Sequence, residues 1–329
     1  RPVVAAEDPH GREDQPDTAD ACQEHTLLAA NRFVSGELSA NRRDPLPFGL
    51  IERLTLTIED VREGHGLPHV LGDEVPRLAR LLWRLIDIAG TNRVPPLSDD
   101  VEPASIKAEF DALTRAAAKV EIAPGIELSR AFWTHADALH SRRAYAALRQ
   151  LARKWPRGHA PQGFLTVFSP GVRGHLVEVA GAQELRVANR VQSFSFTGNP
   201  VKGPFLVMIV AGEYPEAHGY APLRAYAQPI FSGHRFIPVN SEFERDVLRS
   251  VLRARPQLAQ DGIDLLVEKP VFDHLTPAGP CRPDFLIEAR SRKTGEIRQL
   301  ILELLESSEP EVQQRDRLRR IAPLLTLSL

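Results

Sequence analysis

The chain has 329 residues, of which 43% are hydrophobic and 26% charged, and this balance predicts a globular protein of two or three domains. Its two cysteines exclude a disulfide scaffold and a Cys-based zinc site. The longest apolar run, Phe205–Ala211, is far shorter than the ~20 residues that span a bilayer, and the first residues lack a signal-peptide core. We therefore expect a cytoplasmic protein with no membrane partner. Because the chain begins with Arg and contains one Met, we also expect it to be part of a longer protein.

The formal net charge of −2 is unevenly distributed. Residues 1–25 hold seven acidic and two basic residues, and the remainder holds 39 basic and 36 acidic residues. The first segment is poor in apolar residues, and we expect a disordered acidic tail there. The remainder is too weakly basic for a non-specific DNA coat, although a local basic groove is compatible with it.

Helical signals dominate residues 26–156, with a short helix expected at 25–33 and a short strand at 54–58. Residues 74–90 carry a helical apolar stripe that Gly90 should end. Ser105 is a candidate N-cap for the next helix. Residues 129–155 show the amphipathic pattern of one long helix that stops before Pro156.

The pattern of apolar residues changes from helical to strand-like at residues 163–240, where short β-rich runs alternate with Gly, Pro and Asn. We therefore expect a β-rich middle domain there. Its aromatic side chains could stack nucleic-acid bases on a small barrel. With only 6% aromatic residues in the chain, we favour the alternative that they fill the β core.

Residues 241–329 have a different order of elements. A helix at 241–254 is capped by Ser241, and a strand follows at 263–273. Strands at 282–291 and 296–306 flank the turn Arg-Lys-Thr-Gly, which predicts a hairpin. A helix at 310–325 completes an α-β-β-β-α order.

Three acids in this last unit suggest chemistry. Asp284 opens one hairpin strand, Glu303 lies in the apolar run of the other, and Glu244 lies on the preceding helix. A buried carboxylate needs a partner, and two carboxylates at adjacent strand ends can bind Mg²⁺ or Mn²⁺. Ordinary roles stay open for each: a strand-start acid for Asp284, a surface acid for Glu244, and for Glu303 an ion pair with Arg298 or Arg282.

With these residues in this order, Ser241 to about Leu325 resembles the core of the PD-(D/E)xK nuclease superfamily. The matching residues are Glu244 in the first helix, Pro283-Asp284 at one strand and Glu303 in the next. The resemblance implies a metal site formed by Glu244, Asp284, Glu303 and the main-chain carbonyl of Leu304, with Asp284 and Glu303 as catalytic residues.

The chain departs from the family pattern at the lysine that follows the second acid. Leu305 stands at that position, and Asp316 stands where some relatives place the lysine on the next helix. Arg315 and Arg317 flank Asp316 and are candidate phosphate-stabilising catalytic residues, although arginine is a poor proton shuttle. Asn240 replaces an acid found in one group of relatives.

Further basic residues are candidates for contacts with a phosphate backbone, or alternatively form solvated surfaces. They are Arg282, Arg290, Arg292, Lys293, Arg298, Arg319 and Arg320. No phosphate-cradling GxxxxGK[ST] loop and no GxGxxG sequence is present, which disfavours an NTPase or a Rossmann enzyme.

The expected fold is α+β, with a helical N-terminal region, a β-rich middle domain and a C-terminal restriction-endonuclease-like α/β core. The leading hypothesis is a nucleic-acid-acting protein, a Mg²⁺-dependent DNA nuclease if it is active, with DNA favoured over RNA. The alternative is a catalytically degenerate nuclease fold that binds nucleic acid or a partner protein in a mobile-element or defence complex.

Overall fold

The structure is a computed structural model that describes residues 76–97, 104–123, 125–140, 142–155, 161–179, 184–193, 201–214, 219–276 and 279–304. The predicted acidic tail, the elements expected at 25–33 and 54–58, and the helix at 310–325 lie outside these residues.

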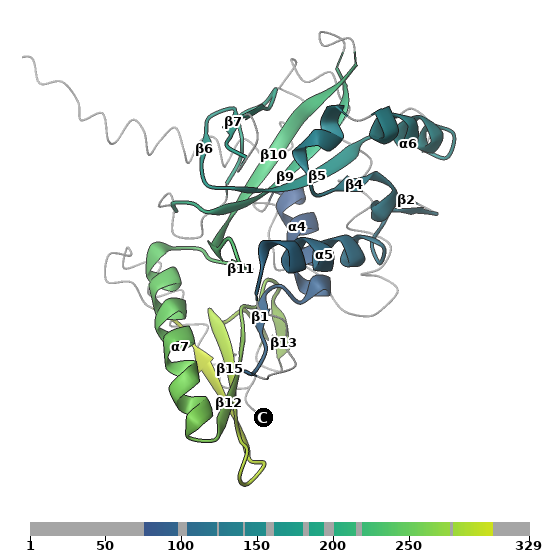
Figure 1. Cartoon of the computed structure of the whole chain (residues 1–329). Helices are drawn as coiled ribbons and strands as arrows, with labels where there is room; N and C mark the ends of the chain where they lie inside the picture. Colours follow the sequence, from purple (N-terminus) through teal and green to yellow (C-terminus); the bar gives the residue numbers. More distant parts are fainter. Residues whose placement is uncertain are drawn as a thin grey trace, which may run out of the picture.

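The N-terminal and middle parts of the described chain contain three α-helices, two 3₁₀ helices and eleven strands (Figure 1). In chain order they are α4 (Arg77–Ala89), β1 (Arg93–Val94), α5 (Ile106–Ala117), β2 (Glu121–Ala123), β3 (Ile126–Glu127), η2 (Leu128–Ala131), β4 (Phe132–Trp133), η3 (Ala136–His140), α6 (Arg142–Ala152), β5 (Gly163–Ser169), β6 (Val172–Arg173), β7 (Leu176–Val177), β8 (Leu185–Arg186), β9 (Phe205–Tyr214), β10 (Gly219–Ser232) and β11 (Arg235–Pro238). The C-terminal part adds α7 (Glu242–Gln260), β12 (Ile263–Glu268), β13 (His274–Thr276), β14 (Gly279–Cys281), β15 (Phe285–Ser291) and β16 (Ile297–Leu302).

A five-stranded sheet with the order β11-β10-β9-β5-β4 forms the centre of the upper part in Figure 1. Its strands are apolar on both faces, because each face is covered by another layer. Helices α4, α5 and α6 and the η2 segment cover one face, and the small sheet β6-β7-β8 covers the other.

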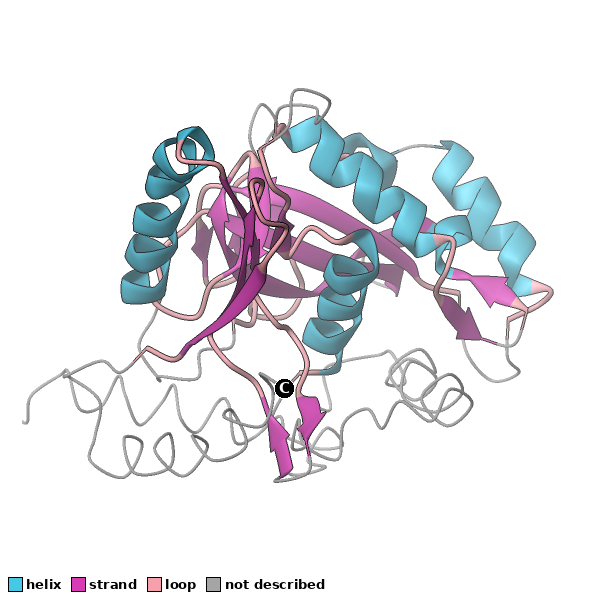
Figure 2. Cartoon of the chain, turned by 90° about the horizontal axis from the view of Figure 1, so that it is seen from below, coloured by secondary structure: helices cyan, strands magenta, loops and turns pink. Residues whose placement is uncertain are grey.

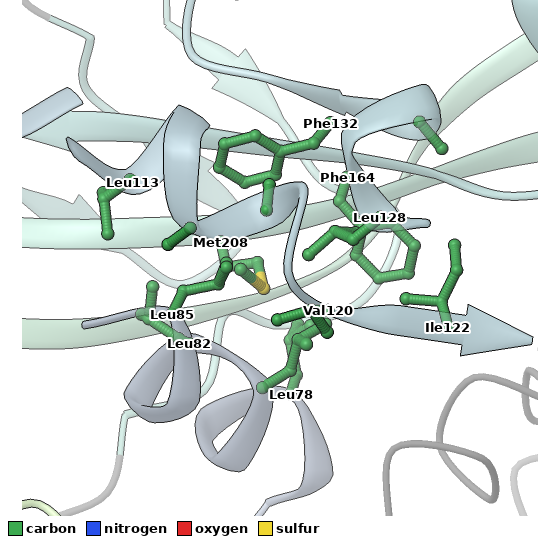
Figure 3. Packing of buried hydrophobic residues seen from close by; sticks show 14 of the residues in the cluster. Leu78, Leu82, Leu85, Leu113, Val120, Ile122, Leu128, Phe132, Phe164 and Met208 are labelled. Atoms are coloured by element: carbon green, nitrogen blue, oxygen red, sulfur yellow. The ribbon is translucent and has the colours of Figure 1, made fainter. Parts of the chain in front are cut away.

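The helix-covered face holds the largest hydrophobic core of the described chain. Figure 3 shows Leu82 and Leu85 of α4 meeting Met208 of the sheet, with Phe164 packed beside Leu128. Trp83 of α4 adds a polar contact, since its indole N–H donates to Gln228 Oε1 at 2.6 Å. Among the described aromatic side chains of the β region, Phe164, Phe205 and Tyr226 are buried, which supports the prediction that they fill the core.

Three predicted helix ends are confirmed. Gly90 ends α4 with a φ of 69°, a left-handed conformation that glycine adopts without strain. The Ser105 side chain accepts a hydrogen bond from the Ala108 N–H at 3.1 Å, and Ser241 accepts one from Glu244 at the same distance. These caps satisfy backbone donors that a helix cannot pair internally.

The prediction of a single long helix at 129–155 is wrong. Phe132 and Trp133 form the short strand β4, which pairs in parallel with Phe164 and Leu165 of β5. The apolar spacing of the segment fits a helix, but burial of the two aromatic residues against the sheet overrides it. The helix therefore begins only at Arg142.

The second sheet has the order β1-β12-β15-β16, with α7 packed along it (Figures 1 and 2). The predicted hairpin is confirmed, because β15 and β16 pair in antiparallel register around a turn in which Gly295 has a φ of 72°. Strand β1 comes from the N-terminal region and pairs with β12 through Arg93–Glu268 and Val94–Val267. The C-terminal sheet is thus completed by a segment more than 170 residues away in sequence.

Helix α7 extends past its predicted end at 254 and continues through Pro256 to Gln260. Two contacts hold its last turns in spite of the proline. The buried Arg255 donates to the Pro95 carbonyl, and Leu258 packs against the third hydrophobic core. The fold of the described chain is therefore mixed α and β, with a C-terminal core of one helix against an antiparallel sheet.

Substitution of Glu109 by Gln is expected to raise stability at alkaline pH. Glu109 of α5 is buried and accepts a hydrogen bond from the Phe236 N–H at 3.0 Å. Burial raises the pKa of its carboxyl to about 7, so its stabilising contribution is present at acidic pH and is lost as the pH rises through about 7. Urea unfolding should show the Gln variant more stable than the wild type by about 2 kcal/mol at pH 8.5, with the difference vanishing near pH 5.

The matched control is Asp111→Asn on the exposed side of the same helix, which should be neutral at both pH values. An equal pH dependence in the wild type and the Glu109→Gln variant would contradict the assignment.

Candidate active site at one end of the C-terminal sheet

The ends of four strands and the first turn of a helix meet at one end of the C-terminal sheet. The register pairs Glu268 with Leu286 and Phe285 with Leu302, so β12 ends beside the start of β15 and the end of β16. The start of β1 lies at the same end, because Arg93 pairs with Glu268. The first turn of α7 adds Glu244 to this group through the contacts described next.

Glu244 is 3% exposed, and its carboxylate is fully engaged by neighbouring donors. The backbone N–H of Asn240 donates to Oε2, and the Asn240 side-chain amide donates to Oε1 at 3.4 Å. The ammonium group of Lys269 also donates to Oε1. Asn240 thus supplies two hydrogen bonds to this glutamate.

Lys269 is the site residue that the sequence pattern did not predict. It follows the last residue of β12 and is 4% exposed, and its Nζ lies between Glu244 Oε1 and Asp284 Oδ1, 3.6 Å from the latter. The family pattern indicates a lysine only at positions after Glu303. The sequence offered one signal, a lysine two residues after the apolar run Leu265-Leu266-Val267, because a cation buried beside such a run requires acidic partners.

The backbone of Lys269 is held by the residue that precedes β1. Its N–H donates to the Asn92 carbonyl at 2.9 Å, and the Asn92 side-chain amide donates back to the Lys269 carbonyl at 3.0 Å. The ammonium also lies 5.2 Å from the centre of the Phe285 ring, a cation–π distance. Residues from distant parts of the chain therefore fix the lysine in one position.

Asp284 and Glu303 end neighbouring strands, one step beyond the Phe285–Leu302 pair. Continued by one step, this register sets the two residues opposite each other just outside the paired strands, where opposed residues of an antiparallel pair share a face. The backbone N–H of Leu304 donates to Asp284 Oδ2 at 2.7 Å, so Leu304 takes part in the site through its N–H. Both oxygens of Asp284 thus have defined neighbours.

The buried carboxylates influence each other electrostatically. Burial raises the pKa of Glu244 to about 7, and the Asp284 charge adds to this effect, whereas Lys269 and the Asn240 N–H oppose it. Burial also raises the pKa of the Cys281 thiol, with smaller contributions from Asp273 and Glu303. The buried Cys281 is therefore held as a neutral thiol.

The carboxylate oxygens of Asp284 and Glu303 belong to the class of ligand that Mg²⁺ and Mn²⁺ prefer. Within the described ranges, no group of three or more His, Cys, Asp or Glu side chains is gathered closely enough to hold a metal. The four-ligand site with Glu244, Asp284, Glu303 and the Leu304 carbonyl stays a prediction.

Of the residues predicted to contact phosphate, three contact acidic side chains and two are described by their exposure. Arg282 is largely buried, 3.7 Å from Asp273 Oδ1 and over the Trp83 ring of α4. Arg292 forms a bidentate ion pair with Asp264, which lowers the pKa of that carboxyl, and Arg298 pairs with Glu296. Lys293 is exposed in the hairpin turn, and Arg290 is exposed at the end of β15.

The predicted residues of the last helix, Arg315, Arg317, Arg319 and Arg320, lie outside the described residues.

A buried arginine connects the first turn of α7 to the central sheet. Arg245 is 4% exposed and binds both oxygens of Glu242. Its other terminal nitrogen donates to the carbonyls of Lys202 and Ile230, at 2.8 and 3.2 Å. The position of Glu244, one residue earlier, is therefore held in part by contacts of Arg245 with β10 of the five-stranded sheet and with Lys202.

Within the described residues, no helix is both long and apolar enough to cross a membrane.

Comparison with curated proteins and with solved structures gives no significant match. Two family models do match. One, described as a restriction endonuclease-like C-terminal domain, covers residues 240–329 and agrees with the α7–β16 core. The other, described as a domain of unknown function (DUF8535), covers residues 59–230, which is more than half of the chain. The chain therefore belongs to the DUF8535 family and joins that domain to a restriction endonuclease-like C-terminal domain.

Proposed function

We propose that the C-terminal domain hydrolyses phosphodiester bonds in nucleic acid, DNA in preference to RNA, with a divalent cation at Asp284 and Glu303. The observation that carries this proposal is Lys269, a lysine 3.6 Å from Asp284 that comes from a strand other than the one bearing the family lysine. It supplies a positive charge to a site whose sequence pattern lacks one.

Each residue has a distinct part in this proposal. A divalent cation, when bound, would neutralise phosphate charge and activate water. The Leu304 N–H orients Asp284, and Lys269 stabilises negative charge that develops on the phosphate. Glu244 holds the lysine in place through the ion pair with its ammonium group.

A cleavage assay tests the proposal directly. The whole chain would be incubated with single- and double-stranded DNA and RNA in Mg²⁺, Mn²⁺ or EDTA. We expect metal-dependent cutting that falls at least ~100-fold in the Asp284→Asn and Glu303→Gln variants, while binding in EDTA persists. Asp111→Asn on the exposed side of α5 is the matched control and should cut like the wild type.

The second candidate is a nucleic-acid-binding or protein-adaptor module without catalysis. It is favoured by the enclosure of Lys269, whose ammonium is already paired with Glu244. Salt-sensitive binding by the wild type without cutting in either metal would select this function. Neither binding nor cutting would exclude both functions for the isolated chain.

A further inference from the structure

Helix α6 carries an exposed basic surface in the DUF8535 region. Arg142–Trp155 contains five cations and no acid, and all five cations are exposed: Arg142, Arg143, Arg149, Arg153 and Lys154. Figure 1 shows α6 on the outside of the upper part, while the β15–β16 hairpin lies at the bottom of the view. This surface is therefore distinct from the residues of the C-terminal domain discussed above.

The helical period separates the basic residues from the core. Ala144, Leu148, Leu151 and Trp155 are buried and fix the inner face of α6. On a 3.6-residue period, positions 142 and 149 fall on the opposite face, and so does Arg153 in the turn just after α6, where the Trp155 N–H still donates to the Leu151 carbonyl at 2.8 Å. The helix is anchored by its apolar side, so the three arginines are presented to solvent on a rigid support.

Helix stability does not account for these cations. Arg142 and Arg143 lie in the first turn, where a positive charge opposes the helix dipole, and no acid occupies that turn. Arg149 and Arg153 are like charges four residues apart, which repel each other. In the described part of the chain, no acid forms an ion pair with Arg142, Arg149, Arg153 or Lys154.

Some exposed cations elsewhere in the described chain are paired with an acid. Lys107 lies 3.9 Å from Asp111, and Arg292 binds Asp264 through several hydrogen bonds. The α6 surface instead accumulates positive charge along a helix that contains no acid, which matches an extended anionic partner.

We propose that the α6 surface, Arg142, Arg149, Arg153 and Lys154, binds the phosphate backbone of a nucleic acid. At ~1.5 Å per residue, the outer three arginines extend over roughly 16 Å of the helix, a length along which duplex DNA carries about nine or ten phosphate charges. Guanidinium groups suit phosphate because they donate two parallel hydrogen bonds. The choice of nucleic acid among polyanions rests on the proposed function of the C-terminal domain.

The test compares two triple variants that remove the same charge from the same region. One is Arg142→Gln, Arg149→Gln, Arg153→Gln, and the control is Lys107→Gln, Arg115→Gln, Lys119→Gln on and just after α5, whose targets are also exposed. Fluorescence anisotropy with a duplex of about 20 base pairs in EDTA, over roughly 50–200 mM salt, gives Kd and its salt dependence. Circular dichroism confirms that both variants fold.

We expect the α6 variant to weaken binding at about 100 mM salt by about tenfold or more. The slope of log affinity against log salt should fall by about 2–3, because each lost phosphate contact contributes ~0.9. The α5 control should change Kd less than about twofold. Equal weakening in both variants, or a wild type that does not bind duplex, would overturn the proposal.

Two further arms test the kind of ligand and the link to cleavage. Selective loss of binding to phosphatidylserine vesicles, with duplex binding unchanged, would assign the surface to a membrane and overturn the proposal. An α6 variant that loses binding while the wild type never cuts would uphold the surface and contradict only the proposed cleavage. In an active enzyme, the α6 variant should raise the nucleic-acid concentration needed for half-maximal cutting and preserve the rate at saturation.

Discussion

Replacement of Lys269 by Met is expected to lower the free energy of unfolding at pH 8 by about 3–5 kcal/mol. The substitution removes the cation between two carboxylates and leaves Glu244, which is 3% exposed, as a buried charge without its ion-pair partner. Met retains most of the aliphatic length of the lysine side chain. Urea unfolding followed by circular dichroism measures the change.

The effect should depend on pH in a definite direction. The folded-state pKa of Glu244 is already raised to about 7, and loss of the ammonium raises it further. A raised folded-state pKa means that stability is present at acidic pH and is lost as the pH increases through that value. The variant should therefore approach the wild type near pH 5 and fall furthest below it above pH 7.

A double variant distinguishes loss of the ion pair from simple loss of packing. Glu244→Gln combined with Lys269→Met removes both charges, and we expect it to recover more than half of the stability lost by Lys269→Met alone. Lys107→Met on the exposed side of α5 is the matched control and should be neutral. A double variant no more stable than Lys269→Met would show that the ion pair is not the cause.

A fragment of residues 240–329 alone is expected not to fold cooperatively. This fragment has the bounds of the C-terminal family match. Three of the eight buried residues of the third hydrophobic core, Val94, Ile237 and Val239, precede this range. Their burial is worth roughly 1.5–3 kcal/mol each, and the total is comparable to the whole stability of a typical domain. The fragment also lacks β1 and the two Asn92 hydrogen bonds that hold Lys269.

The comparison is with a fragment of residues 76–329, which retains all these groups and should unfold in one sigmoidal transition. Amide dispersion in a two-dimensional NMR spectrum, together with thermal melts, distinguishes the two outcomes. A well-dispersed spectrum and a cooperative melt for residues 240–329 would show that β1 is dispensable.

Local signals predicted much of the fold correctly. The caps at Gly90, Ser105 and Ser241 depend on a few adjacent residues, and the hairpin around residues 292–295 depends on its turn. The α4 stripe was likewise evident from its period. Such features are determined within one or two turns of chain, which is the range over which propensity and periodicity act.

Features that depend on distant contacts were not predictable in this way. The 129–155 segment has a helical apolar spacing, but Phe132 and Trp133 gain more from pairing with β5. Strand β1 has only two residues, too few for any periodic signal. Both are decided by the tertiary surface on which they pack.

The sequence pattern singled out the three acids as candidates for the site, and it did not single out Lys269. The order of Glu244, Asp284 and Glu303 along the chain resembles the nuclease pattern. Lys269, by contrast, approaches Asp284 from the end of β12, on the side of β15 opposite to β16. β15 lies between β12 and β16, so a side chain at the end of either neighbour can approach the same carboxylate. A pattern written along β16 alone cannot include a residue of β12.

The pairing of β1 with β12 also constrains when the molecule can complete its fold during synthesis. Arg93 and Glu268 are separated by 175 positions, and at ~5–20 residues per second the ribosome needs about 10–35 s to deliver the second strand after the first. α4 and β10 can dock earlier, since Trp83 and Gln228 are 145 positions apart. The C-terminal sheet, and with it the setting of Lys269 between its two acids, can therefore form only after β12, β15 and β16 have been synthesised, whereas the five-stranded sheet can assemble earlier.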